Sequence, residues 1–219
     1  MDYELTQNEV RVLGALIEKE LTTPDYYPLT LNAVVAACNQ KSNRDPVMTL
    51  TAADAEEAIE GLRKHVLAWR RNVAGARVSK YEHNFNIKYK LIPQEVAVMC
   101  VLFLRGPQTL GEIRGRTGRM FTFENLDDVG KVLAGLKEKE DGPFVKELPR
   151  QPGRKEHRYM HLFSGDTEVE DSASSVQAEF APTAPAKGRI EMLEEEIKDI
   201  HEEIAELRKQ FEDFKRAFE

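Results

Sequence analysis

Basic residues that could bind phosphate groups cluster in and beside two pairs of segments in which apolar and polar residues alternate. The segments are 67–71 with 77–85 and 144–148 with 155–163, and a further basic loop spans residues 39–46. Lys and Arg on strands and turns are suited to contacts with nucleic-acid phosphates, although they are also common on solvated loops. The candidate phosphate-binding residues are Lys41, Arg44, Arg70, Arg71, Arg77, Lys80, Arg150, Arg154, Lys155 and Arg158.

No combination of residues indicates catalysis. The sequence contains no glycine-rich phosphate loop, zinc-type spacing or nucleophile elbow. We therefore expect no enzymatic activity, no metal site and no cofactor. His83 and His161 occupy equivalent strand positions, which favours a structural role for both. Trp69 is expected in the core of its hairpin rather than as a platform for base stacking.

These segments belong to a unit that occurs twice in the first 165 residues. Leu5-Thr-Gln-Asn-Glu9-Val returns as Leu91-Ile-Pro-Gln-Glu95-Val, and Gly61-Leu returns as Gly135-Leu. The segment ending in Lys80-Tyr81-Glu-His83-Asn-Phe85 returns as Arg158-Tyr159-Met-His161-Leu-Phe163. A repeat of about 80 residues is a small domain and is too long for one unit of a solenoid.

Each unit begins with three predicted helices and ends with a predicted β-hairpin. Capping signals mark the helix starts at Thr6, Thr30 and Thr51 in the first unit and at Thr109 and Asn125 in the second. Pro93 suits the first turn of the helix that opens the second unit. Three helices followed by a hairpin are typical of the winged-helix form of the helix-turn-helix.

The predicted fold class is therefore mainly α with small β-hairpins (α+β), as two tandem winged-helix domains followed by a coiled-coil-type helix. We expect the first domain at residues 1–88, the second at 89–164, a disordered linker at 165–188 and a heptad helix at 189–219. The linker is rich in Ser, Ala, Pro and acidic residues and has no apolar period.

The final segment repeats apolar residues at alternating spacings of three and four. This pattern fits positions a and d of a coiled coil over four heptads and predicts a homo-oligomer. The alternative is a single amphipathic helix that folds back on the rest of the chain. The predicted oligomerisation residues are Ile190, Leu193, Ile197, Ile200, Ile204, Leu207, Phe211, Phe214 and Phe218.

The net charge of −7 is unevenly distributed. Residues 1–165 carry +2, from 24 Lys and Arg against 22 Asp and Glu, whereas residues 166–219 carry −9, from 7 against 16. The acidic balance is thus no argument against nucleic-acid binding by the first 165 residues. In both units, however, the third helix begins with acidic residues, Asp54, Glu56 and Glu57 in the first, which disfavours base recognition by that helix.

The sequence also indicates where the protein resides. It contains no run of roughly 18 apolar residues and no signal-peptide pattern, so we expect a soluble, cytoplasmic protein. Cys38 and Cys100 lie on apolar helix faces, where buried reduced thiols are expected and a disulfide is the alternative.

Several longer motifs resemble the bacterial YceH-like family over residues 5 to 163. They are Glu18-Lys-Glu-Leu-Thr-Thr-Pro24-Asp-Tyr-Tyr-Pro28, Ala37-Cys-Asn-Gln-Lys41-Ser-Asn-Arg44-Asp-Pro-Val47, Arg77-Val-Ser-Lys80-Tyr-Glu-His83, Leu104-Arg-Gly-Pro-Gln-Thr109 and Leu148-Pro-Arg-Gln-Pro-Gly153. The resemblance implies tandem winged helices and a C-terminal heptad helix. It implies no established biochemical function and no catalytic residues.

Together these features predict a regulatory, non-enzymatic protein that contacts double-stranded DNA weakly and in a salt-dependent manner. The contacts would run through the hairpins and the loop from Lys41 to Arg44. The alternative is a protein-interaction scaffold that uses the acidic third helices and the heptad helix to bind protein partners.

Overall fold

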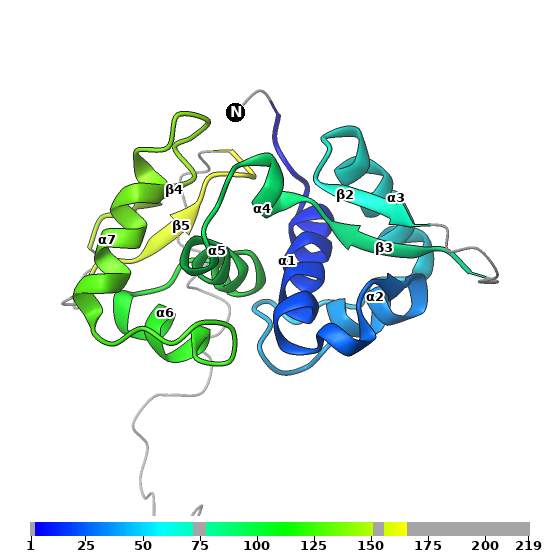
Figure 1. Cartoon of the computed structure of the whole chain (residues 1–219), viewed down its shortest axis with the longest axis horizontal. Helices are drawn as coiled ribbons and strands as arrows, with labels where there is room; N and C mark the ends of the chain where they lie inside the picture. Colours follow the sequence, from blue (N-terminus) through cyan, green and yellow to red (C-terminus); the bar gives the residue numbers. More distant parts are fainter. Residues whose placement is uncertain (1–2, 72–77, 151–155, 166–219) are drawn as a thin grey trace, which may run out of the picture. The chain divides into compact units, whose positions relative to one another are not determined.

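The computed structural model describes residues 3–71, 78–150 and 156–165, and these form helices with two small antiparallel sheets. The prediction of a mainly α fold with small β-hairpins is confirmed at this level. Figure 1 shows two halves, which we define as residues 3–88 and 89–165, on either side of two central helices. The first half contains α1 (Gln7–Thr22), η1 (Pro24–Tyr26), β1 (Leu29–Thr30), α2 (Leu31–Cys38), α3 (Ala52–Lys64), β2 (Ala68–Arg71), β3 (Lys80–His83) and α4 (Phe85–Lys88). The second contains α5 (Pro93–Arg105), α6 (Leu110–Thr117), α7 (Leu126–Lys137), β4 (Val145–Glu147) and β5 (Tyr159–His161).

Local capping interactions start the helices where the sequence predicts. Thr6 and Glu9 form a capping box at α1, and Thr51 and Asp54 form one at α3. Thr109 and Glu112 do the same at α6, while Thr30 and Asn125 cap α2 and α7. Pro93 lies at the start of α5, where its missing N–H has no intrahelical partner to lose.

The two halves differ in how they complete the predicted hairpin. In the first, β3 lies between β1 and β2, and Tyr81 is opposite Leu29 on one side and Arg70 on the other. In the second, β4 and β5 form a two-stranded sheet, and a single bridge from Gln108 to Tyr159 takes the place of β1. Neither β1 nor α4 is evident in the sequence, because elements of two and four residues are too short to show a period.

The central helices α1 and α5 pack closely and join the halves through one hydrophobic core. The thiol of Cys100 on α5 donates a hydrogen bond to the carbonyl of Gly14 on α1 at 3.5 Å. A Cβ atom on Gly14 would lie only 2.9 Å from the side chain of Leu104. Aromatic rings from both halves extend the core beside these helices, among them Phe85, Phe103 and Phe163 with centroids 5.3–5.4 Å apart.

Two further predictions concern single residues. Cys38 and Cys100 are buried free thiols, as expected. Trp69 is 47% exposed, so the prediction that it belongs to the hairpin core is wrong. Its neighbour Ala68 takes the inward position because β2 places alternate side chains on opposite faces.

The predicted linker lies outside the described residues apart from Gly165, and so does the whole heptad helix, including every predicted oligomerisation residue. Among the described residues, no helix has the length and apolar character needed to cross a membrane.

Candidate nucleic-acid interface

The solvent-facing side of the β2–β3 pair combines an exposed indole with two cationic side chains. Trp69 lies opposite Glu82, and Arg71 lies opposite Lys80, so all four side chains share one face. Like charges that face each other across a strand pair destabilise it. Glu82 offsets part of this repulsion, because its Oε1 accepts a hydrogen bond from Nε of Arg71 at 2.7 Å. The side chain of Arg71 nevertheless remains 64% exposed.

Arg70 lies on the opposite face of the same strand, directly across from the buried Tyr81. Its Nε donates to Oγ of Ser79 at 2.8 Å. The first hairpin therefore carries cations on both faces. Arg77, the other candidate of this hairpin, lies outside the described residues.

The two candidate residues of the loop between α2 and α3 differ in exposure. Lys41 is exposed, as a phosphate contact requires. The Arg44 side chain is fully buried, and its guanidinium donates to both carboxylate oxygens of Glu18 and to the carbonyl of Ala37. Burial raises the pKa of Glu18, but the hydrogen bonds and charge of Arg44 more than offset this and leave that pKa below its usual value. The prediction that Arg44 contacts phosphates is therefore wrong, because its donors and charge are engaged inside the protein.

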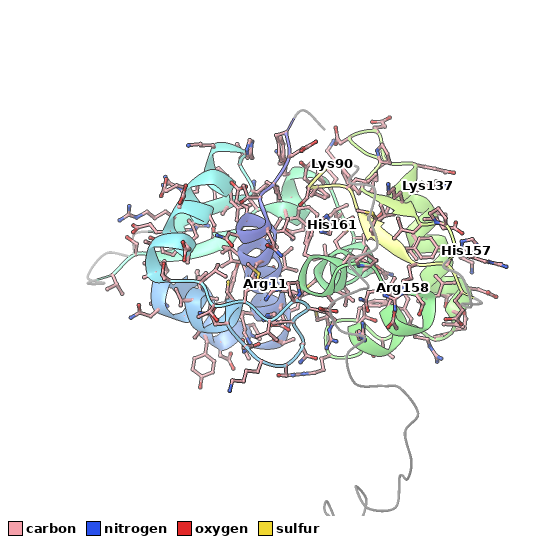
Figure 2. All side chains as sticks on the ribbon, turned by 180° about the vertical axis from the view of Figure 1, so that it is seen from behind. Arg11, Lys90, Lys137, His157, Arg158 and His161 are labelled. Atoms are coloured by element: carbon pink, nitrogen blue, oxygen red, sulfur yellow. The ribbon has the colours of Figure 1, made fainter. Side chains whose placement is uncertain are left out.

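The second hairpin is less suited to phosphate contact than the sequence suggested. Arg158 donates to the carbonyl of Pro107 at 2.9 Å and pairs with Glu112 at 3.4 Å. Arg150 donates to Nε2 of His157 at 2.7 Å, and the other ring nitrogen of His157 lies 2.9 Å from Glu147. Figure 2 shows His157 and Arg158 on the second half. Arg154 and Lys155 lie outside the described residues.

A cleft between the halves is lined by cations, of which only Lys41 is a candidate from the sequence. Arg105 ends α5, Arg116 lies in the last turn of α6, and Arg119 follows that helix. Lys19 and Lys41 of the first half line the adjoining part of the same region. Burial lowers the pKa of Arg105, and the charges of Arg116 and Arg44 lower it further. Basic residues at three helix ends are the only sequence signal for this cluster, and such residues are also favoured there by the helix dipole.

The start of α3 is acidic, as the sequence predicts. Glu56 and Glu57 are exposed, and the pKa of Asp54 is lowered by hydrogen bonds from the side chain and the backbone N–H of Thr51. A carboxylate held ionised at this end would repel a phosphate that approached it. The start of α3 is therefore unsuited to phosphate contact.

The two cysteines are buried in the described part of the chain. Burial raises the pKa of the Cys38 thiol to about 12 and raises that of Cys100 as well, so neither forms a reactive thiolate near neutral pH. In the ranges that the structure describes, no cluster of three or more His, Cys, Asp or Glu residues could hold a metal ion.

Comparison with known proteins places the chain in a family. A family model described as "Protein of unknown function, DUF480" matches residues 5–154. The UPF0502 protein of Solibacter usitatus is 50% identical over 220 residues, which cover all of both chains. The UPF0502 protein YceH of Escherichia fergusonii is 46% identical over 204 residues, covering 91% of this chain and 94% of that protein. The UPF0502 protein of Geobacter metallireducens is 51% identical over 221 residues, again covering both chains in full. The chain therefore belongs to the DUF480 family of uncharacterised bacterial proteins, also named UPF0502, which includes the YceH proteins that its motifs resemble.

Proposed function

We propose that this protein is a non-enzymatic, regulatory, tandem winged-helix protein that contacts nucleic-acid phosphates mainly through the β2–β3 hairpin. The order of elements supports the winged-helix interpretation, because each half has three longer helices followed by an antiparallel strand pair. Fold alone does not imply DNA binding, so the proposal depends on the surface of the hairpin.

One observation carries the proposal: Trp69, Arg71 and Lys80 share the exposed face of the β2–β3 pair. The facing cations Arg71 and Lys80 repel each other across the strand pair, so this pairing is not explained by the stability of the hairpin. The same combination is common on nucleic-acid-binding surfaces, where cations contact phosphates and an aromatic ring packs on bases or sugars.

The charges on the protein surface favour contact with the DNA phosphate backbone over recognition of bases. The acidic start of α3, with Glu56 and Glu57 exposed, opposes its entry into the major groove. Phosphate contacts through the hairpin, with Lys41 as a further contact, carry no sequence information. We therefore propose weak, salt-dependent DNA binding of low sequence specificity.

Trp69 provides the test, because it is the only tryptophan in the chain. A short random-sequence duplex added to the full-length protein at low salt should quench and shift the Trp69 emission, and added salt should reverse the change. The double variant Arg71→Ala/Lys80→Ala should lose most of the response. Arg63→Ala is the matched control, since Arg63 is an exposed arginine on α3 that pairs with Glu60. An emission spectrum unchanged by DNA would remove the support for the hairpin as the interface.

A protein-interaction scaffold is the second candidate, and the exposed acidic residues of α3 favour it. On this account the α3 surface would bind a basic partner, and the C-terminal heptad helix would form a homo-oligomer. A basic peptide would then bind the chain at low salt, and Glu56→Gln/Glu57→Gln would weaken it, while DNA would leave Trp69 unaffected.

A further inference from the structure

The two equivalent histidines of the repeat have different surroundings. In the first half, His83 uses both ring nitrogens: Nδ1 accepts from the backbone N–H of Phe85 at 3.3 Å, and Nε2 lies 2.6 Å from Oε2 of Glu20. Because Nδ1 accepts a hydrogen bond, Nε2 carries the ring proton and donates a hydrogen bond to the carboxylate of Glu20. A histidine at this strand position is therefore satisfied by a carboxylate from the end of α1.

The second half has the histidine without the carboxylate. The repeat aligns Leu5 with Leu91 and Glu9 with Glu95. At the same spacing, the position equivalent to Glu20 is Gly106, which follows α5 and has no carboxylate. Nδ1 of His161 is buried and has no hydrogen-bond partner among the described residues. Its ring packs edge-on against Phe103 at 5.1 Å, and burial lowers its pKa to about 4, so the ring is neutral near pH 7.

The space beside His161 is a pocket of about 240 Å³ between the two halves. Apolar side chains of α1, α5 and the segment before α3 line it, together with Gln7, Ser164 and the acidic residue Asp45. The apolar lining residues are Val10, Pro46, Met48, Leu102 and Phe103. This volume lies below the roughly 300–1,000 Å³ of most drug-sized pockets, so it fits a small molecule.

Arg11 contributes a second unsatisfied group to the same pocket. It is 2% exposed, and its terminal nitrogens donate to the carbonyls of Cys38 at 3.2 Å and Pro46 at 2.6 Å. These bonds fix the guanidinium, while its Nε has no hydrogen-bond partner in the described part of the chain. Burial and the charge of Arg44 lower the pKa of Arg11, and the charge of Asp45, which also lines the pocket, offsets only part of this lowering. A buried charge that is only partly compensated is costly. Figure 2 shows Arg11 on α1 and His161 on β5 near the centre of the molecule, where the halves meet.

We propose that this pocket binds a small organic anion, a carboxylate with an apolar body. The ligand carboxylate would accept a hydrogen bond from Nδ1 of His161, the ring nitrogen that has no partner among the described residues. Arg11 supplies the positive charge that selects an anion, and Phe103, Leu102 and Met48 contact the apolar body. Two unsatisfied buried polar groups in one apolar pocket are the arrangement that a small amphipathic ligand completes.

The test is a titration of the full-length protein with benzoate, phenylacetate and hexanoate, followed through the ring signals of ¹⁵N-labelled histidines. Benzyl alcohol, which has the apolar body without the charge, is the matched control ligand. The His161 signals, identified by their loss in His161→Phe, should shift and saturate with at least one carboxylate and remain in place with benzyl alcohol. The His157 signals should not move.

Two variants distinguish binding in the pocket from a general effect of substitution on folding. Arg11→Met should weaken carboxylate binding at least tenfold, and His157→Gln, on the surface of the second half, should leave it unchanged. If Arg11→Met fails to fold, Met48→Trp, which fills the pocket, should abolish the shift of His161. The proposal is overturned if none of the three carboxylates shifts His161, or if benzyl alcohol shifts it equally. DNA binding through the hairpin does not enter this test, so the two proposals can fail separately.

Discussion

Cys100 and Gly14 occupy the same position in the two repeats, and they touch each other. The thiol of Cys100 donates to the carbonyl of Gly14 at 3.5 Å, where α5 packs against α1. The correspondence that relates Leu5 to Leu91 also relates these two residues. Equivalent residues that meet mark an approximate twofold axis, as in an isologous dimer interface. The structure therefore resembles a dimer fused into one chain, and this explains why the first helix of each unit is apolar on more than one face.

The close approach at this axis requires a residue without a side chain on α1. A Cβ atom at position 14 would lie 2.9 Å from Cδ2 of Leu104 and 3.0 Å from Cβ of Phe103. Gly14→Ala should lower the free energy of unfolding by about 1–2 kcal/mol in urea denaturation, because overpacking outweighs the gain in helix propensity. Gly130→Ala on α7 is the control, since its Cβ would meet nothing within 4 Å. It should be neutral or stabilise by about 0.5–1 kcal/mol. Equal effects of the two substitutions would contradict the close packing of α1 on α5.

Gly61 and Gly135 are equivalent positions of the repeat, but their surroundings differ. A Cβ atom on Gly61 would lie 1.8 Å from Oε1 of the buried Glu9, whereas one on Gly135 would lie 3.9 Å from Oε1 of Glu95. Gly61→Ala must displace the carboxylate that accepts from the N–H of Thr6 at 2.7 Å. We expect it to cost about 1–2 kcal/mol through loss of the capping box. Gly135→Ala should be tolerated, and thermal unfolding of both variants would reveal whether the two sites do differ.

The stability of the protein should depend on the protonation of His161. Burial lowers the folded-state pKa of His161 to about 4, below the value of about 6.5 for an unfolded chain. Between these values the unfolded state binds the additional proton, so stability is lost as pH falls below about 6.5 and the loss is complete near pH 4. Relative to His161→Gln, the wild type should lose about 2 kcal/mol of unfolding free energy between about pH 6.5 and 5. Carboxylates titrate in both proteins and cancel in the difference, so parallel pH profiles would show that His161 is not buried as described.

Assembly through the C-terminal segment remains a prediction from the sequence. Ile204→Asp would place a carboxylate at a central core position of the predicted coiled coil, at a cost of several kcal/mol by order of magnitude. Light scattering should find an oligomer for the wild type and a monomer for the variant. An oligomer that survives the substitution would place the interface elsewhere in the chain.

The features that the sequence predicts well are those set by neighbouring residues. Thr6 with Glu9 and Thr51 with Asp54 start helices through contacts three residues apart, so their spacing is visible in the sequence. Burial of a polar or aromatic side chain depends on distant segments. The predictions were therefore wrong for Trp69, which is exposed, and for Arg44, which pairs with a glutamate 26 residues away.

The remaining site features arise from the packing of one half on the other. The cleft that contains Arg105 and Lys41 and the pocket that contains Arg11 and His161 are each built from both repeats. No spacing within one repeat can predict which residues meet across the axis. Comparison of the repeats is informative once the structure is known, as the change from Glu20 to Gly106 illustrates.

The central claim is that the β2–β3 hairpin contacts nucleic-acid phosphates. The most direct measurement is the salt dependence of binding to a fluorescein-labelled random duplex, by anisotropy, for the wild type, Arg71→Ala/Lys80→Ala and the control Arg63→Ala. The account predicts that log K falls linearly with log salt for the wild type. The double variant should bind more weakly and have a slope shallower by about 1–2, since each lost phosphate contact removes about 0.9. The control should match the wild type. Wild-type and double-variant curves that coincide, or no binding by any of the three at low salt, would contradict the claim.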